Sequence, residues 1–310
     1  MPVYVIIVIC AVSAAFALFT VSAALREGAR AAAAAALSFP RCAILGFAFA
    51  KAFYVLLMET GNIIEWGECD GLFSLQPRTF CFTGGGIGVW LGLLLSAGIA
   101  GYRPTGRLTD LFSVPGALLV AGLRMAEIEL AGLGTGRFVE TEAGMSAPLF
   151  TVINQYGEAH VAIFAWEAVW AVIVAAASLT DRNDCPGRRF ERAVFRLCAG
   201  QILLENMRSE ALRWGFVRVE QVLCAAIMTA LMLAACRRKT QKRGGVRYLP
   251  ALGLVVCFAV IVGIEFIRQR SPSRFMGETG GYLMMGFVLV MILVLYRQVT
   301  GSPRRPAQNR

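Results

Sequence analysis

Ionisable side chains stand inside long apolar segments of this chain. Arg124 lies within an apolar run, and Glu127 follows it about one helical turn later. A charged side chain in the hydrocarbon of a bilayer costs roughly 2.5–3.5 kcal/mol on insertion scales, so such groups face an interior or a wet cavity and usually have a partner. Further ionisable residues in or at the edge of apolar segments are Lys51, Glu167, Glu205 and Arg208. We expect this set of residues to bind something polar at membrane depth.

The segments that position these side chains are long and apolar. The chain has 310 residues, of which 57% are hydrophobic and 16% are charged, and its mean hydropathy is +0.63. A helix needs about 20 apolar residues to cross about 30 Å of hydrocarbon. The sequence therefore predicts an all-α, polytopic integral membrane protein with nine helices, at residues 3–25, 42–58, 81–101, 111–131, 161–180, 193–212, 219–236, 249–268 and 280–297.

The basic residues predict how these helices are oriented. Alternate loops, among them 26–41, 181–192 and 236–247, contain most of the arginines and lysines. The positive-inside rule makes these loops cytoplasmic, which places the N-terminus outside and the C-terminus in the cytoplasm. The net charge of +10 is mostly this topology signal. Because the charge is divided among short loops, we do not expect nucleic-acid binding.

The strongly basic segment at 236–247 also divides the chain. We predict a membrane domain at residues 1–240, a cytoplasmic linker at 241–248, two additional transmembrane helices within 249–297 and a cytoplasmic tail at 298–310. The alanine-rich segment 26–41 is expected to continue the first helix into the cytoplasm. The long polar loop 132–160 is expected to form a small lid on the outer side.

No metal or cofactor site is expected. His160 is the single histidine, and no two cysteines have the C-x-x-C spacing. A His-rich or paired-cysteine metal site is therefore excluded by composition.

Five stretches, taken in chain order, resemble the motifs of a known family. They are residues 50–57 (AKAFYVLL), 82–90 (FTGGGIGVW), 122–137 (GLRMAEIELAGLGTGR), 160–167 (HVAIFAWE), and 201–208 (QILLENMR) together with 219–221 (VEQ). In order and spacing they resemble the motifs of the bacterial prolipoprotein diacylglyceryl transferase family. The resemblance covers about residues 1–240 and agrees with that family's seven-helix topology and external N-terminus. The last two helices lie outside it.

The resemblance implies an activity in the plane of the bacterial plasma membrane. The family transfers the diacylglyceryl group of phosphatidylglycerol to the lipobox cysteine of a prolipoprotein. The implied partners are therefore phosphatidylglycerol, a prolipoprotein and the bilayer. Guanidinium groups bind phosphate well, because their N–H donors match the spacing of its oxygens. Arg124 and Arg137 are the candidates for this contact.

The resemblance also implies roles for other residues. Catalytic roles would belong to Arg124, Glu205 and Glu167, with Glu167 orienting a basic partner. Glu205 and Arg208 are spaced i, i+3 and would pair on one helix face. The lipid-binding residues would be Lys51, which stands at an arginine position of the family, with Gly85, Gly86, Glu127, Gly136, Arg137 and Arg208.

Several of these residues have a structural interpretation as well. Arg124 and Glu127 would then form a buried ion pair with no ligand. Gly85 and Gly86 would allow close helix packing, and Lys51 would extend to the membrane interface. These alternatives stay open on the sequence alone.

Three positions depart from the family pattern. Thr83 stands where the family has a histidine, Glu127 where it has an asparagine, and Gln201 where it has a basic residue. Losing the histidine removes the obvious proton acceptor at neutral pH. The alternative hypothesis is a catalytically silent member that binds lipid or assists assembly. A small-solute transporter is a third hypothesis, which no internal repeat supports.

Overall fold

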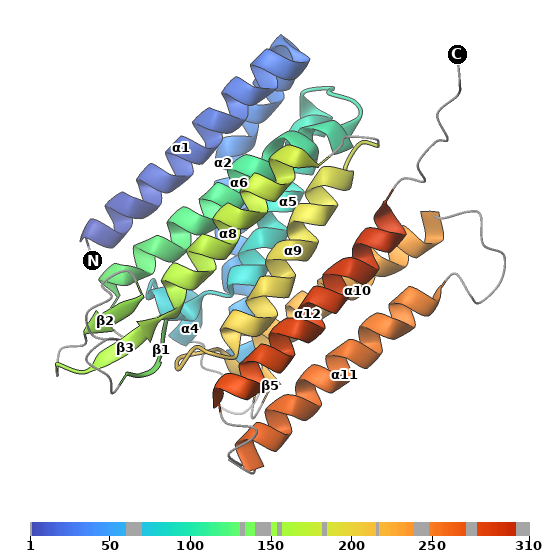
Figure 1. Cartoon of the computed structure of the whole chain (residues 1–310). Helices are drawn as coiled ribbons and strands as arrows, with labels where there is room; N and C mark the ends of the chain where they lie inside the picture. Colours follow the sequence, from blue (N-terminus) through green and yellow to red (C-terminus); the bar gives the residue numbers. More distant parts are fainter. Residues whose placement is uncertain are drawn as a thin grey trace. The chain divides into compact units, whose positions relative to one another are not determined.

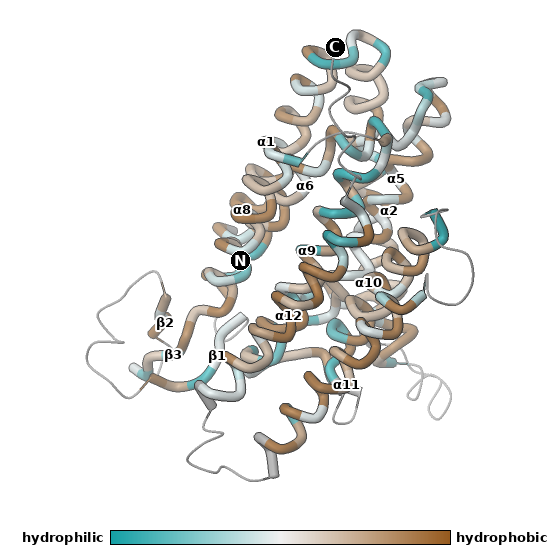
Figure 2. Tube along the Cα trace, turned by 45° about the vertical axis from the view of Figure 1, so that its right-hand side comes forward, coloured by the Kyte–Doolittle hydropathy of each residue, from teal (hydrophilic) through white to brown (hydrophobic). Residues whose placement is uncertain are grey.

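Long helices make up most of the protein (Figure 1). The structure is a computed structural model that describes residues 2–59, 70–130, 134–139, 150–153, 157–181, 185–214, 217–238, 248–270 and 278–301. Within these residues, eight helices are long and apolar enough to cross a membrane. Figure 2 shows the corresponding apolar stretches, for example along α8 and α12. The prediction of an all-α polytopic membrane protein is confirmed.

The chain forms two compact units. Unit 1 contains residues 1–197 and 204–223, and unit 2 contains residues 198–203 and 224–310. Two helices, α9 (Arg188–Glu205) and α10 (Val219–Arg238), contribute to both. The predicted functional boundary near residue 240 stays a prediction.

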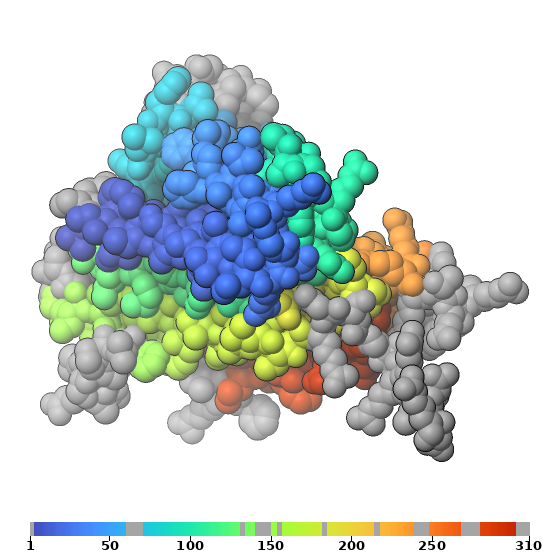
Figure 3. Space-filling view, turned by 90° about the horizontal axis from the view of Figure 1, so that it is seen from above, coloured from blue at the N-terminus to red at the C-terminus, as the bar shows by residue number. Residues whose placement is uncertain are grey.

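Unit 1 is a bundle of antiparallel and parallel helices with short elements at one end. Its packed pairs are α2 with α5, α6 with α8, and α1 with α6 and α2. In the space-filling view, α1 and α2 (blue) lie directly against the green surface of later residues (Figure 3). Its helices are α1 (Pro2–Glu27), α2 (Ala29–Tyr54) with the π-helical turn η1 (Val55–Glu59), α4 (Asp70–Phe73), η2 (Pro77–Thr79), α5 (Phe82–Ile99), α6 (Thr105–Ala126) with the 3-10 turn η3 (Glu127–Glu129), α8 (Ile163–Thr180) and most of α9.

Glycines bring α5 very close to α2. A Cβ placed on Gly88 would lie 2.2 Å from the carbonyl oxygen of Leu45, and one on Gly92 would lie 2.9 Å from Cα of Cys42. No larger residue fits these positions without moving a backbone. Small residues at such contacts let two apolar helices associate in lipid, where hydrophobic burial gives little advantage.

A small antiparallel sheet closes one end of unit 1. It consists of β1 (Thr135–Phe138), β2 (Thr151–Ile153) and β3 (Ala159–Ala162), in the order β1-β3-β2, with Val152 opposite His160. The sheet lies at the same end as the N-terminus of α1 (Figure 1). Two antiparallel strands of two residues each, β4 (Arg213–Trp214) and β5 (Val217–Arg218), precede α10. The described part of the predicted lid is therefore this sheet.

Two predicted segment assignments were wrong. Gly28 has φ +84, a conformation that ends α1 at Glu27, so the alanine-rich segment belongs to α2 rather than to the first helix. The predicted helix 193–212 is α9, which begins at Arg188 and ends at Glu205. Its charged first turns keep it out of the eight apolar candidates. The side chain of Arg218 donates to the carbonyl oxygens of Glu205 and Arg208, which satisfies backbone acceptors where the helix stops.

Unit 2 contains the rest of α10 with α11 (Leu249–Arg270) and α12 (Glu278–Thr300). Helices α11 and α12 pack against each other. Met228, Leu254, Met285 and Ile292 are fully buried. The two helices predicted after the basic segment are therefore present, with slightly longer bounds.

Candidate functional site

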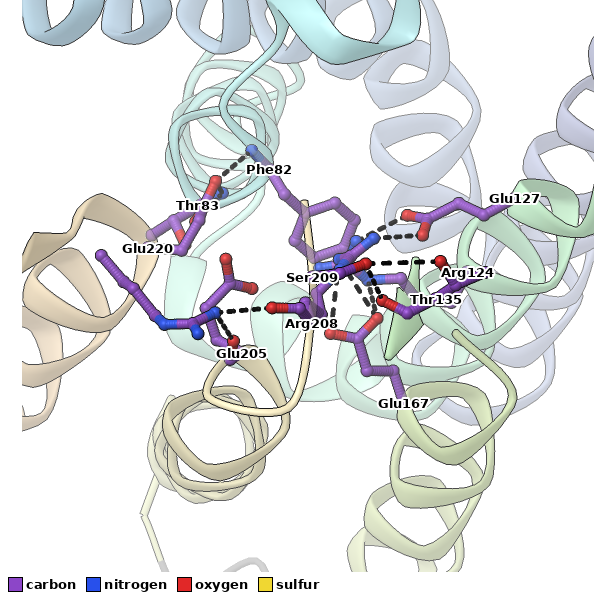
Figure 4. Close-up of polar contacts among 11 residues, drawn as sticks. Phe82, Thr83, Arg124, Glu127, Thr135, Glu167, Glu205, Arg208, Ser209 and Glu220 are labelled. Carbon is purple, nitrogen blue, oxygen red and sulfur yellow. Dashed lines mark hydrogen bonds and ion pairs between the residues drawn. The ribbon is translucent and has the colours of Figure 1, made fainter. Parts of the chain in front are cut away.

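Four charged side chains of unit 1 form a closed ring of ion pairs (Figure 4). Arg124 donates from Nη1 to Oε1 of Glu127 at 2.6 Å, and its Nε lies 3.2 Å from Oε2 of Glu167. Arg208 donates from Nη2 to Oε2 of Glu127, and its Nη1 lies 3.3 Å from Oε2 of Glu167. Each carboxylate therefore joins both guanidinium groups. We call Arg124, Glu127, Glu167 and Arg208 the ionic ring.

The ionic ring is buried and electrically balanced. Its residues are 3%, 8%, 4% and 7% exposed in the order just given. Two guanidinium groups and two carboxylates carry no net charge together. Removing one member of such a buried set leaves an uncompensated charge, which is much more costly than the intact set.

Separate elements place the four members. Arg124 is in the last turn of α6, and Glu127 opens η3 directly after it, so the pair is spaced i, i+3. Glu167 is in the first turns of α8. Arg208 follows the end of α9 in a short turn, in which the amide of Arg208 donates to the carbonyl of Glu205. The prediction that Glu205 and Arg208 share a helix face is therefore wrong, because the helix ends between them.

Strand β1 holds the turn that carries Arg208. The amide and the hydroxyl of Ser209 both donate to the carbonyl oxygen of Thr135, at 2.9 and 2.8 Å. Gly136 allows this close approach, since a Cβ there would lie 2.8 Å from the carbonyl oxygen of Met207. Gly136 thus supports the site through the backbone, and its neighbour Arg137 is exposed.

A buried carboxylate outside the ionic ring, that of Glu220, holds the start of α5. The amide of Phe82 donates to Oε1 of Glu220 at 2.7 Å, and the amide of Thr83 donates to Oε2 at 3.1 Å. The hydroxyl of Thr83 also donates to Oε2 of Glu220. A carboxylate at a helix N-terminus satisfies free amides and interacts favourably with the helix dipole. Both the amide and the hydroxyl of Thr83 are therefore engaged by Glu220.

The start of α5 also contacts the ionic ring. The guanidinium carbon of Arg124 lies 3.9 Å from the centre of the Phe82 ring, a cation–π contact (Figure 4). Beside it, Cys81 is a buried free thiol whose sulfur accepts from the amide of Gly84.

The ionic ring lies at one end of a cavity of about 800 Å³ in unit 1. Arg124, Glu127 and Arg208 line this end together with Glu205 and Glu220, and the ion pair of Arg78 with Glu210 also lines the cavity. The remaining walls are mostly apolar side chains of α1, α2, α5, α6 and α9. The cavity therefore has one charged end and a long apolar remainder.

The predicted site residues fall into two groups. Seven line the cavity or complete its ring: Arg124, Glu127, Glu167, Glu205, Arg208, Gly85 and Gly86. Lys51, Gly136 and Arg137 are not among the lining residues. Lys51 is buried, and its Nζ donates to the carbonyls of Ser74 and Thr79 and to the Thr79 hydroxyl, so it holds the segment before α5.

Two residues of the site, Phe82 and Glu220, lie inside the quoted motifs but were not predicted as site residues. Glu220 opens an apolar helix, and the same reasoning that selected Glu167 would have selected it. Phe82 carries no comparable signal, because an aromatic residue in an apolar segment is ordinary. Within the described residues, no group of three or more His, Cys, Asp or Glu side chains is placed to hold a metal ion.

Comparisons with protein-family models, with curated proteins and with solved structures find no match for this chain. The family resemblance therefore rests on the five sequence motifs.

Proposed function

We propose that unit 1 binds phosphatidylglycerol and transfers its diacylglyceryl group to the cysteine of a prolipoprotein at the bacterial plasma membrane. The observation that carries this proposal is the cavity of about 800 Å³ with apolar walls and a charged end. Its volume lies within the roughly 300–1,000 Å³ that small-molecule sites occupy. A ligand with an ionic headgroup and an apolar tail matches both parts of the cavity.

The headgroup would be held by two guanidinium groups. Arg124 and Arg208 both reach the charged end, whereas Arg137 does not line it. Without lipid, Glu127 bridges the two arginines. A phosphate that enters would replace Glu127 as the acceptor between them, because it offers the same paired oxygens.

The reaction needs a proton acceptor and charge stabilisation. A bond forms between the cysteine sulfur and the carbon of the diacylglyceryl group that carries the phosphate, and the bond from that carbon to the phosphate oxygen breaks. Glycerol phosphate leaves with the negative charge, which Arg124 and Arg208 would stabilise. The thiol proton would go to a buried carboxylate on the cavity wall, Glu127 once displaced or Glu205.

A second candidate function is lipid binding without turnover. The specific observation in its favour is that both guanidinium groups already have two carboxylate partners, and that Glu220 holds Thr83. Such a protein would use the same cavity to present or retain lipid during membrane assembly.

The orientation of unit 1 is part of the proposal. The N-terminus of α1 and the sheet β1–β3 lie at one end (Figure 1), and β1 holds the turn that carries Arg208. We place this end outside the cytoplasm, where a prolipoprotein cysteine emerges. A reporter that is active only outside the cytoplasm should give a signal when inserted in loop 59–80 and none when fused after Arg305. The opposite pattern contradicts this orientation.

Complementation separates the two candidates. The chain is expressed in a strain depleted of its own diacylglyceryl transferase, with Arg124→Gln as the matched variant, and lipid binding is measured on the purified protein. Growth and lipoprotein modification by the natural sequence alone support the transferase. No rescue with retained phosphatidylglycerol binding supports the silent protein. No binding of phosphatidylglycerol contradicts both.

A further inference from the structure

The cavity ends, opposite the ionic ring, at a level where three helices present phenylalanines. The residues of α1 that line it run from Tyr4 to Phe16, and those of α6 run back from Glu127 to Phe112. On α9 the lining residues reach Phe190. We call Phe16, Phe112 and Phe190 the aromatic floor.

The aromatic floor belongs to a packed core. The rings of Phe16 and Phe112 are 5.6 Å apart, and Phe19 and Phe39 extend the cluster at 5.1 Å from Phe112 and 5.2 Å from Phe16. Phe190 packs against the same buried cluster. Aromatic pairs at these distances are favourable, so this end of the cavity is closed by interlocked side chains.

A buried carboxylate fixes the floor from below. Asp110, two residues before Phe112 on α6, accepts from the amide of Gly187 at 2.7 Å and from the amide of Phe190 at 2.9 Å. The start of α9 is thereby tied to α6 at the depth of the floor. Phe190 therefore keeps a fixed height relative to Phe112.

The distance from the ionic ring to the aromatic floor is long enough for a lipid chain. Fifteen residues separate Phe112 from Glu127 on α6 and η3, which at 1.5 Å per residue is roughly 22 Å. One leaflet of a bilayer provides roughly half of the ~30 Å hydrocarbon thickness, or about 15 Å, for an extended chain. A whole acyl chain therefore fits inside unit 1 while its headgroup stays at the charged end.

We infer that one acyl chain of the bound phospholipid lies along α6 with its methyl end against the aromatic floor, and that the floor sets the chain length that unit 1 selects. This inference rests on the proposed binding of a phospholipid headgroup at the ionic ring. The selection is steric, because a chain gains little hydrophobic energy on leaving one apolar medium for another. One methylene too many or too few in an apolar pocket changes binding by roughly tenfold or more.

Two substitutions move the floor in opposite directions. Phe112→Ala removes a ring and lengthens the cavity. Gly116→Leu adds a side chain one helical turn above Phe112, at a residue that lines the cavity; its Cβ would lie 2.7 Å from the ring edge of Phe112, so that ring has to shift to admit it. Leu118→Ala is the matched control, because Leu118 is on the same helix, is 37% exposed and does not line the cavity.

The experiment measures binding of phosphatidylglycerols that differ only in chain length, from lauroyl to stearoyl, to the full-length protein by native mass spectrometry. The natural protein is expected to prefer one length roughly tenfold over the longest chains. Phe112→Ala should move the preference to longer chains and Gly116→Leu to shorter ones, with Leu118→Ala unchanged. Gly116→Leu leaves no void, so it tests the inference even if Phe112→Ala does not fold.

The possible results are distinct. Binding of all lengths with equal affinity, or a length profile that neither floor variant changes, overturns the inference and leaves the proposed function intact. No binding of any phosphatidylglycerol overturns the proposed function itself. Length-selective binding without rescue in the complementation assay supports the floor and assigns the cavity to a protein without turnover.

Discussion

Unit 1 and unit 2 differ in what they bury. Every charged residue that is buried within the described ranges belongs to unit 1: Lys51, Asp110, Arg124, Glu127, Glu167, Arg189, Glu205, Arg208 and Glu220. Unit 2 buries methionine, leucine and isoleucine side chains such as Met228, Leu254 and Ile292. Both units contain helices with the composition of membrane spans. Helices of similar apolar composition therefore enclose buried charges in unit 1 and pack through apolar side chains in unit 2.

The buried charges of unit 1 limit which substitutions it tolerates more strongly than apolar packing does in unit 2. A buried charge is tolerated only with well-placed partners, so each member of the ionic ring depends on the other three. Apolar side chains exchange partners at small cost if volume is kept. Substitutions in the ionic ring of unit 1 should therefore lower the free energy of unfolding strongly, and substitutions in unit 2 should lower it little.

The largest effect is expected for Glu167→Ala. This change removes one of the two carboxylates that join Arg124 and Arg208 and leaves a net positive charge buried. The free energy of unfolding should fall by about 3–5 kcal/mol, measured by chemical denaturation in detergent. Arg297→Ala, at an exposed position of α12 in unit 2, is the control and should cost less than about 1 kcal/mol. Equal losses in the two variants would show that the two units do not differ as described.

A smaller effect is expected for Arg124→Gln, which should change both lipid binding and stability. Arg124→Gln should weaken phosphatidylglycerol binding by about 1.5–3 kcal/mol, the contribution of hydrogen bonds to a charged group. It should also lower stability, because Glu127 and Glu167 keep only Arg208 of the ring's two guanidinium groups. Native mass spectrometry and thermal unfolding give the two readouts.

The double substitution Arg124→Gln with Glu127→Gln decides between the roles. Replacing both members of a buried pair is often nearly neutral, so stability should recover. Lipid binding should stay weak if Arg124 holds the phosphate. If the stable double variant binds lipid as well as the natural protein, Arg124 and Glu127 have only a structural role.

A modest effect is expected at the start of α5. Glu220→Gln removes the charge that faces the amides of Phe82 and Thr83 and should lower stability by about 1 kcal/mol. Hydrogen exchange at those two amides should become faster. Glu210→Gln is the control for stability and exchange, since Glu210 lines the cavity but is exposed and pairs with Arg78 at 3.1 Å; exposed pairs contribute about 0–1 kcal/mol. Unchanged exchange at the start of α5 would contradict the role given to Glu220.

The smallest effect is expected when most of unit 2 is removed. A chain that ends at Lys242 lacks α11 and α12 but keeps the ring and the cavity. It should still insert into the membrane and bind phosphatidylglycerol, which membrane fractionation and native mass spectrometry would test. Degradation of this chain, or loss of binding, would mean that unit 1 depends on the last two helices.

The sequence alone determined the class of protein and most of the helices. Hydrophobic segments of about 20 residues have one stable form in a bilayer, because every backbone amide and carbonyl must be satisfied within the segment. The predicted helix ends were wrong at two places where local backbone interactions end a helix. Gly28 ended a helix inside a helix-forming sequence, and Arg218 capped the backbone where α9 stops.

The sequence also selected Arg124, Glu127, Glu167 and Arg208, because an isolated charge in an apolar segment is unusual whatever the fold. Their pairing was decided by the tertiary structure alone. Arg208 lies beyond the end of its helix and meets Glu127 and Glu167 from other elements, a contact over 81 and 41 positions that no local spacing encodes. The aromatic floor is likewise a tertiary feature, since Phe16, Phe112 and Phe190 are ordinary apolar residues until three helices end the cavity at the same depth.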